Sequence, residues 1–488
     1  MRIYDHVKFG LMALEWLLSI PGGHSVPLTP QLPTLCSRNS VTVAQNSSSV
    51  WPWQEYTSSS AKPPYLEINA TGEQLAPGLI FFDPQTGINP RSYIPDQAPF
   101  IMTDTGDLIW SGPVTPDASN FRVQELYGEP VITYWAGSGG ASSSASASHG
   151  YGHIIIQNSS YDQIATVCPS FNLTLPPGQS APCQADVHES FITEDNTILV
   201  TAYNITSANL KDLGGPEEGR NTWTTYLVDR KGNILWQIDG ETGGDFGGLP
   251  EGGRFSWQHY ARIARLSHTQ LQLRYFANNN GDPTTSNPSV GLEFLLTVPP
   301  ATDHPPQLLK NLSDPLYPVA SLAMGTHDIL SNDNHFLGYG IQPVMKEFGP
   351  QDPQGRDVRW SARYNFENGA ASYRTYKTNW RASPSTKPSL QIKKVGSGSN
   401  VSSGLDGIEC GSSEIRGYIS WNGATEVKHF VVYTGSDENS MTAVGITRKQ
   451  GFETEFAIPE GYGHKFVQVG AVENNHSGVV MKSAIMQM

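Results

Sequence analysis

The chain has 488 residues, of which 38% are hydrophobic and 16% are charged. That length is enough for a large core and for more than one domain, so we expect one large domain and one small one. The formal net charge of -14 argues against nucleic acid and anionic membrane surfaces as partners, because both bind basic patches.

Residues 1–25 have the layout of a secretory signal peptide. Arg2 and Lys8 precede an apolar run over residues 9–20, interrupted by Glu15, and residues 23–25 offer a cleavage site. The run is too short to span a bilayer, and no other segment of the sequence is long enough. We therefore expect a secreted or secretory-lumen protein without a membrane span.

Glycosylation sequons and cysteines fit the same compartment. Cys168 and Cys183 flank a proline-rich loop and are the first choice for a local disulfide, which would stabilise the fold by about 3 kcal/mol. A bond between Cys36 and Cys410 is a further option that their spacing does not support. N-glycans are expected at the Asn-x-Ser/Thr sites Asn46, Asn69, Asn158, Asn172, Asn204, Asn311, Asn400 and Asn475.

Short strand patterns fill most of the chain after an extended lead-in at residues 26–64. From residue 65 to 384, apolar runs such as 78–82, 130–135, 197–203, 271–276 and 291–297 alternate with Gly, Pro, Asn and Asp turns. Residues 104–110 and 229–236 echo each other as an acidic residue, a glycine turn, two aliphatics and a tryptophan. The pattern predicts an all-β domain, a β-propeller of about six blades or a reduced number.

A second β-domain is predicted at residues 385–488, after the linker at 383–388. Runs at 414–422, 428–433, 442–447, 453–458 and 465–471 alternate apolar and polar residues around Trp421. This spacing is typical of a fibronectin- or immunoglobulin-like β-sandwich.

Residues 229–262 form the stretch that carries the first functional signal. A strand, a tight turn and a second strand lead to a glycine-rich loop that ends in Trp257, Gln258 and His259. Glycines allow backbone angles closed to other residues, so the loop can present His259 at an exposed edge for catalysis. Packing of Trp257 and His259 between two blades is the alternative.

Several blocks resemble a known family when taken together. They lie at residues 121–124, 128–135, 160–164, 186–189, 201–204, 232–236, 255–259, 372–377 and 419–427. The most specific are Asp186-Val187-His188 and Trp257-Gln258-His259. The chain thereby resembles the fungal arylsulfotransferase-like family, which implies a secreted β-propeller. The resemblance implies that His259 matches the histidine that accepts a sulfuryl group and that His188 matches a second functional histidine.

The family's His-x-Asn and Ser-x-Arg motifs are missing where residues 214–220 run almost directly into 224–228. Sulfuryl transfer needs several fixed cations, and only Arg254, Arg262 and Arg374 are expected near the histidines. Some similar fungal proteins instead dehydrate a hydroxymethyl tropolone to a quinone methide and steer its hetero-Diels-Alder addition to a humulene-type sesquiterpene. Our leading hypothesis is therefore this reaction of secondary metabolism, which takes aromatic and terpenoid substrates and needs only an acid-base pair and an aromatic-walled pocket. The alternatives are an arylsulfate sulfotransferase and a noncatalytic module that binds glycan or protein.

Asp186 and His188 are two residues apart on an expected strand, so they share a face and form a candidate acid-base pair, or else a structural one. His259 and Arg262 complete the expected catalytic set, while Glu189 points the other way. No metal or other cofactor is expected. The expected substrate contacts, several of which have core packing as the alternative, are Gln258, Trp257, Trp135, Tyr203, His327 and Trp380.

Overall fold

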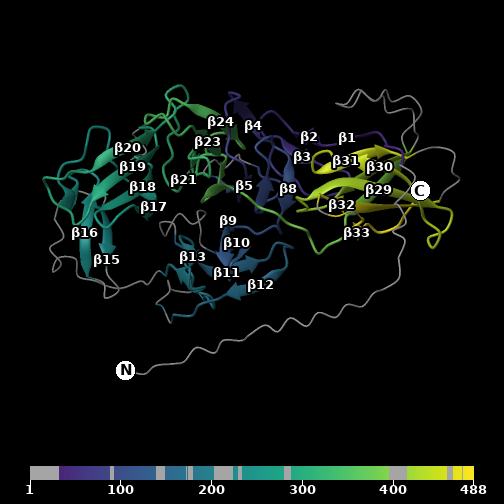
Figure 1. Cartoon of the computed structure of the whole chain (residues 1–488), viewed down its shortest axis with the longest axis horizontal. Helices are drawn as coiled ribbons and strands as arrows, with labels where there is room; N and C mark the ends of the chain where they lie inside the picture. Colours follow the sequence, from purple (N-terminus) through teal and green to yellow (C-terminus); the bar gives the residue numbers. More distant parts are fainter. Residues whose placement is uncertain are drawn as a thin grey trace, which may run out of the picture.

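The protein is all-β, as the sequence predicts (Figure 1). The computed structural model describes residues 32–87, 93–138, 149–171, 173, 180–202, 224–228, 233–279, 287–394, 415–458, 465–474, 476 and 478–488. Among these, the single helical element is the 3-10 turn η1 at Gly244–Phe246. None of the described helices has the length and apolarity needed to cross a bilayer. The expected signal peptide lies outside the described residues.

Four antiparallel sheets of four or five strands build the larger part of the described molecule. The first contains β26 (Thr375–Thr378), β5 (Leu79–Phe82), β7 (Phe100–Met102) and β8 (Leu108–Ser111). The second contains β9 (Ser119–Leu126), β10 (Glu129–Ser138), β11 (Tyr151–Gln157) and β12 (Gln163–Val167). The third contains β17 (Gln258–Arg265), β18 (Gln270–Ala277), β19 (Val290–Thr297) and β20 (Gln307–Leu312). The fourth contains β21 (Thr326–Ile329), β22 (His335–Gly338), β23 (Val344–Phe348), β24 (Val358–Arg363) and β4 (Glu67–Ala70).

Short two-stranded units complete this part. The hairpin β13–β14 precedes residues 203–223, which lie outside the described residues, and β15–β16 follows them. Trp236 and Ile238 of β16 share a core with Leu273 and Phe294 of the third sheet. The strands of these units are β13 (Ser190–Ile192), β14 (Ile198–Val200), β15 (Thr224–Val228), β16 (Ile234–Asp239), β6 (Gln85–Thr86), β25 (Ala370–Ala371), β2 (Thr42–Ala44) and β3 (Trp53–Glu55).

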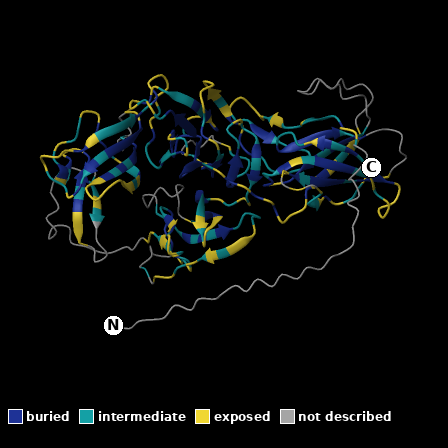
Figure 2. Cartoon of the chain, viewed as in Figure 1, coloured by how far each residue is buried: buried dark blue, intermediate teal, exposed yellow. Residues whose placement is uncertain are grey.

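The sheets follow one another in a circle. β26 contacts β9, β9 contacts β13, β17 contacts β21, and β21 contacts β26. Glu189, directly before β13, forms an ion pair with Arg262 of β17, and its Oε2 lies 3.0 Å from Arg262 Nη2. Buried side chains fill the faces between the sheets, while exposed residues lie at edges and turns (Figure 2). This succession is consistent with a propeller-like fold.

Strands distant in sequence close the circle. β4 pairs with β24, and β26, from the far end of the circle, pairs with β5. Lys377 of β26 is fully buried, and its Nζ donates to Glu347 Oε2 at 2.8 Å and to Asp104 Oδ2 at 3.0 Å. An ammonium group buried between two carboxylates ties the first and fourth sheets together.

Two further sheets share one hydrophobic core at the C-terminal end of the chain (Figure 1). Trp421 lies in that core, and its indole N–H donates to Thr386 O at 2.8 Å. One sheet contains β1 (Ser37–Asn39), β31 (Glu453–Ala457), β28 (Ile415–Ser420) and β27 (Ser389–Lys394). The other contains β30 (Thr442–Arg448), β29 (Val427–Gly435), β32 (Phe466–Glu473), β33 (Met481–Lys482) and β34 (Met486–Gln487).

The predicted lead-in therefore has more structure than its composition indicates. Its strand β1 pairs with β31, and Leu35 packs into the C-terminal core. The reason is non-local, because a three-residue strand has no periodicity of its own until the partner edge is present.

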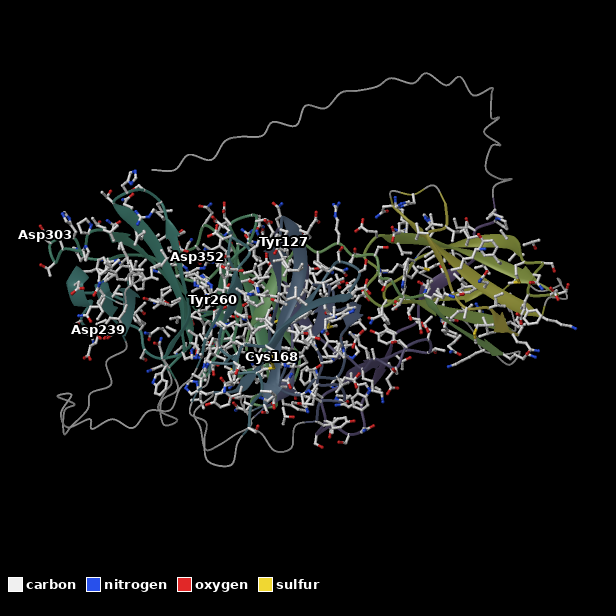
Figure 3. All side chains as sticks on the ribbon, turned by 90° about the horizontal axis from the view of Figure 1, so that it is seen from below. Tyr127, Cys168, Asp239, Tyr260, Asp303 and Asp352 are labelled. Atoms are coloured by element: carbon white, nitrogen blue, oxygen red, sulfur yellow. A yellow bond between two sulfur atoms is a disulfide. The ribbon has the colours of Figure 1, made fainter. Side chains whose placement is uncertain are left out.

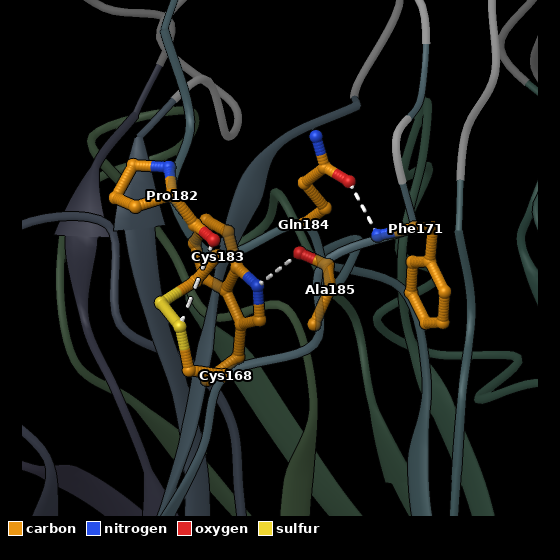
Figure 4. Close-up of a disulfide and its surroundings, with 7 residues drawn as sticks. Cys168, Phe171, Pro182, Cys183, Gln184 and Ala185 are labelled. Atoms are coloured by element: carbon orange, nitrogen blue, oxygen red, sulfur yellow. Dashed lines mark hydrogen bonds between the residues drawn. A yellow bond between two sulfur atoms is a disulfide. The ribbon is translucent and has the colours of Figure 1, made fainter.

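The expected disulfide between Cys168 and Cys183 is confirmed (Figure 4). Two residues after Cys183, Ala185 O accepts a hydrogen bond of 2.9 Å from the indole N–H of the buried residue Trp135. Cys36 is also disulfide-bonded, and Cys410 lies outside the described residues.

Candidate functional site

The structure brings the two motif histidines to one cavity of about 280 Å³. His188 lies between the second sheet and β13, while His259 is the second residue of β17. Both therefore lie where strands of different sheets converge. The described residues that line the cavity are Gln85, Thr86, Gln97, Pro116, Asp117, Ala118, Ser119, Val187, His188, His259, Ala323, Met324, Ala371 and Tyr373.

The ring of His259 is fixed by hydrogen bonds on both nitrogens. Its Nδ1 lies 2.6 Å from Asn278 Oδ1, and Nε2 accepts a longer bond of 3.3 Å from the backbone N–H of Met324. Asn278 donates through Nδ2 to Ser321 O and Met324 O, so its Oδ1 is the acceptor for His259. Nδ1 therefore carries the proton, and the lone pair of the imidazole is on Nε2.

His259 differs from the sequence prediction in its local structure. It lies on a strand and not at the tip of the glycine-rich loop. The backbone is irregular around it, because Trp257 and Tyr260 have φ values of 54° and 55°, and the pairing of β17 with β18 shifts between His259 and Arg262. Such a bulge redirects side chains near a site, and the alternating pattern of a strand is lost there.

Burial lowers the pKa of His259 to about 4, and the nearby charge of Arg374 acts in the same direction. The group is thus neutral at pH 7, and the neutral form is lost as pH falls through about 4. We expect the rate of a step that uses its Nε2 lone pair to be constant from neutral pH to about pH 5 and to fall below it.

The profile of kcat/KM against pH checks this expectation, measured with 4-nitrophenyl sulfate because its phenolate leaves without a proton. Asn278→Asp places a carboxylate against Nδ1, which stabilises the imidazolium, so this variant should move the acid limb to higher pH. A wild-type acid limb near 6.5, the ordinary histidine pKa, would contradict the assignment.

Asp186 fixes the ring of His188, the second motif histidine, by a hydrogen bond. Its Oδ1 lies 2.5 Å from His188 Nδ1, and Oδ2 accepts from Gly150 N at 3.2 Å and lies 3.3 Å from His149 Nδ1. Burial pushes the pKa of Asp186 upward, but the hydrogen bond and charge of His188 outweigh it, so the pKa lies below its usual value. The carboxylate fixes the His188 tautomer and leaves Nε2 available for proton transfer.

The alternation of a strand predicts that Glu189 faces away from His188. In the structure, Glu189 is paired with arginine side chains. Its Oε2 lies 3.0 Å from Arg262 and 4.0 Å from Arg374, and its Oε1 lies 3.3 Å from Arg122. Burial raises the pKa of Glu189, yet the three guanidinium groups hold it below its usual value.

This Arg-Glu cluster, Arg122, Arg262, Arg374 and Glu189, has an excess of positive charge. Within the described part of the chain, the Nε atoms of Arg122 and Arg374 have no hydrogen-bond partner. The cluster thus has three arginines, the number that the sequence predicts, but Arg122 is present in place of Arg254 and Glu189 offsets one charge. Arg254 is exposed and is not part of the cluster.

Tyr260 connects the Arg-Glu cluster to the core. The guanidinium carbons of Arg262 and Arg374 lie 3.9 and 4.9 Å from the centre of its ring. Tyr260 is buried between the sheets, and Figure 3 shows it in the interior of the larger part. Stacking on the ring fixes both guanidinium groups, although neither lines the histidine cavity. Tyr260 and Arg122 line a second cavity.

Several residues predicted to contact substrate lie outside the cavity lining. Trp135 and Trp380 are buried in hydrophobic clusters, where the indole of Trp380 donates to Tyr161 Oη at 3.0 Å. Large aromatic side chains at these positions fill the spaces between strands. His327 is fully buried and bonded to His335.

Two further predicted contacts flank His259. Gln258 donates to Thr225 Oγ1 at 3.4 Å, and Trp257 is 37% exposed; neither lines the cavity. Tyr203 lies outside the described residues.

Sequence reasoning missed Asn278, Tyr373 and Arg122 as members of the site. Asn278 is part of an Asn-Asn-Asn-Gly-Asp run that reads as a turn, while Tyr373 lies in the block 372–377 that contributed to the family resemblance. Burial raises the pKa of Tyr373 to about 12, so its hydroxyl keeps its proton and can donate.

A family comparison matches the part of the chain that contains this site. The model of a family described as Arylsulfotransferase (ASST) matches residues 122–221 and 219–361, a range that contains both cavity histidines. No curated protein matches the chain.

Solved structures with some similarity come from bacteria. They are a protein of unknown function from Bacteroides caccae (11% identity, 77% of this chain and 94% of that chain, TM-score 0.19), the GH43 protein BlXynB from Bacillus licheniformis (7%, 86% and 91%, 0.26) and sucrose-6-phosphate hydrolase from Lactobacillus gasseri (10%, 86% and 88%, 0.25). TM-scores of this size support no argument about fold or function. The chain is therefore similar to the arylsulfotransferase (ASST) family over residues 122–361.

Proposed function

We propose that the protein is an arylsulfate sulfotransferase that passes a sulfuryl group through His259. The observation that carries this proposal is the neutral imidazole at the cavity, with Nδ1–H fixed by Asn278. Its Nε2 lone pair is held only by the long bond of 3.3 Å from Met324 N–H, which has to break when Nε2 attacks sulfur. A nucleophile needs that lone pair in a fixed direction. The family match supports the same chemistry.

The reaction consists of two displacements at sulfur. In the first, Nε2 of His259 attacks the sulfur of an aryl sulfate, the N–S bond forms, and the S–O bond to the aryl group breaks. The departing phenolate takes a proton from His188. In the second step, the oxygen of an acceptor phenol attacks the sulfur, the new S–O bond forms and the N–S bond breaks. The acceptor phenol gives its proton to His188 in this step. The Arg-Glu cluster contributes positive potential for the transferred group.

The two hypotheses differ in what the cavity has to hold. Stepwise transfer through a histidine needs only one aromatic partner in each half-reaction, whereas the cycloaddition needs two ring systems held together.

His188 is expected to act as the general acid, which predicts a dependence on the leaving group. His188→Gln should slow transfer from a sulfate of a weakly acidic phenol by about 100-fold or more, because that phenolate needs a proton to leave. Transfer from 4-nitrophenyl sulfate should change far less, since nitrophenolate leaves unprotonated. Steady-state rates with both donors measure the difference, and equal losses would argue against the acid role.

The direct test is mass spectrometry of the protein with an aryl sulfate and no acceptor. We expect one added sulfuryl group on His259, which disappears when a phenol is supplied. Absence of the adduct, together with absence of sulfated phenol, would refute the proposal.

Dehydration and hetero-Diels-Alder addition remain the second candidate. The Asp186–His188 pair and Tyr373 supply an acid-base set, and Ala118, Ala323 and Met324 give the cavity apolar walls. Incubation with a hydroxymethyl tropolone and humulenol tests it, and a cycloadduct lost in His259→Ala would favour it over sulfuryl transfer. Activity with neither substrate set would favour a glycan- or protein-binding module.

We also propose that the four large sheets are propeller blades, that the two C-terminal sheets form a fibronectin- or immunoglobulin-like sandwich, and that the chain is secreted with N-glycans. Among the predicted glycan sites, Asn46 and Asn69 are exposed, and Asn158 and Asn311 are half-buried. The others, Asn172, Asn204, Asn400 and Asn475, lie outside the described residues. Expression in a eukaryotic secretory host, followed by glycosidase treatment and peptide mapping, tests secretion and glycosylation.

A further inference from the structure

A second cluster of functional groups lies between the third and fourth sheets, away from the cavity lining. It consists of Glu293 on β19, His327 on β21 and His335 on β22, with exposed fractions of 4%, 0% and 4%. His327 Nε2 and His335 Nδ1 are 3.0 Å apart, and Glu293 Oε2 lies 4.0 Å from His335 Nδ1. All three ligand atoms lie within 4.8 Å of one another.

Only one of the two carboxylate oxygens of Glu293 has a hydrogen-bond partner among the described residues. Gln272 Nε2 donates to its Oε1 at 2.7 Å, which fixes the side chain. Its Oε2 accepts no hydrogen bond from the described residues, although it is buried. Leaving a carboxylate oxygen without a partner in a protein interior is costly, so the position indicates an ion or water that is held there.

The tautomer of His327 suits a ligand. Its Nδ1 lies 3.0 Å from the carbonyl oxygen of Tyr275, which can only accept, so Nδ1 carries the proton and the Nε2 lone pair points toward His335. A hydrogen bond from the second ring nitrogen to a backbone carbonyl is the usual support of a metal-bound histidine.

The hydrogen bond between the two rings defines the tautomer of His335. Because His327 Nε2 carries a lone pair, His335 Nδ1 is the donor across the 3.0 Å that separate them. Binding of a cation through His335 Nδ1 therefore moves that proton to the other ring nitrogen, and the ion replaces the hydrogen bond. Arg274, which lies on β18 of the third sheet, is paired with Asp328 at 2.9 Å.

We propose that Glu293, His327 and His335 bind one divalent transition-metal ion, with zinc as the best match to two imidazoles and a carboxylate. Tetrahedral ligation with bonds of about 2.1 Å separates ligand atoms by about 3.4 Å. The spacings of 3.0 and 4.0 Å lie on either side of that value. Since the three ligand atoms lie within 4.8 Å of one another, a rotation of the carboxylate toward the rings completes a three-residue set.

The ion would join β19 to β21 and β22, and thus two neighbouring sheets. Gly291, also on β19, is part of this arrangement, because a Cβ there would lie 3.1 Å from His327 Nδ1. The absence of a side chain lets the imidazole approach the strand closely. The role that follows is structural, since none of the three residues lines the cavity.

Zinc binding by the chelator-treated full-length protein tests the proposal. We expect titration calorimetry to show one equivalent of zinc per chain, and thermal unfolding to shift upward with zinc but not with magnesium. Glu293→Gln should weaken binding by about 100-fold or more. This substitution keeps the shape and an acceptor for Gln272, so the apoprotein should still fold.

His149, Asp186 and His188 form the other described group with ligand spacing, and they provide the control. A variant with both His149→Gln and His188→Gln should bind zinc as wild type does. If that variant loses the zinc, or if Glu293→Gln binds as tightly as wild type, the proposal is wrong. Absence of binding by wild type would also overturn it, and would leave His327 and His335 as a hydrogen-bonded pair.

If Glu293→Gln fails to fold, the same proposal can be tested with His335→Gln and with Co²⁺ in place of zinc. Wild type with Co²⁺ should show the intense visible absorption of a tetrahedral site, and His335→Gln should lack it. A weak octahedral spectrum in wild type would contradict the assigned ligands.

Discussion

His259→Ala is expected to lower kcat/KM for an aryl sulfate by about 1000-fold or more, because the variant has no atom that can accept the sulfuryl group. The sulfuryl adduct should be absent in the same variant. His188 and the Arg-Glu cluster remain in place, so binding of the aryl sulfate should change much less than turnover. Single-turnover kinetics with a chromogenic aryl sulfate separates the two quantities.

His268→Ala is the matched control, because His268 is exposed in the turn between β17 and β18 of the same sheet. This substitution should leave the rate within about twofold of wild type. Comparable activity in His259→Ala and wild type would remove His259 from the mechanism. Equal losses in both variants would point to damage to the sheet and not to chemistry.

Lys377→Met is expected to reduce the free energy of unfolding by about 3 to 5 kcal/mol, because it leaves Glu347 as a buried charge without its cation. Glu347 is itself fully buried. Its Oε1 accepts from Ala76 N at 2.7 Å and Asn334 Nδ2 at 2.6 Å, while its Oε2 depends on Lys377. Urea unfolding at pH 7, followed by tryptophan fluorescence, measures the loss.

Combining Lys377→Met with Glu347→Gln should recover much of that loss, since the amide removes the buried charge and keeps an acceptor for Ala76 N–H. The exposed Lys394 provides the control, and Lys394→Met should change the stability by less than about 0.5 kcal/mol. A loss below about 1 kcal/mol in Lys377→Met would show that the buried ion pair is not what holds the first and fourth sheets together.

Much of the strand content is readable in the sequence because apolar runs and turn residues are local signals. The apolar run at 291–297 becomes β19, and the Asp104 to Asp107 turn carries Gly106 at a φ of 90°, which favours glycine. The same reasoning does not predict β17. The left-handed residues Trp257, directly before the strand, and Tyr260, within it, break the period of two that marks a strand.

The site is predictable only in part, since its members come from separate sheets. The motif histidines were found from their blocks, but their shared cavity depends on how the strands converge. Arg122 and Glu189 are distant in sequence, and no spacing rule connects them. Glu293 likewise lies far along the chain from His327, so their proximity appears only once β19 packs beside β21.

The pairing of β4 with β24, β5 with β26 and β1 with β31 has a consequence for biosynthesis. Each of these N-terminal strands leaves the ribosome long before its partner exists, and until then its backbone edge is open to pairing with other chains. The protein therefore cannot complete its fold as it emerges. Translation has to reach β31 before the last of these edges is covered, so truncated products should be far more prone to aggregation than the full chain.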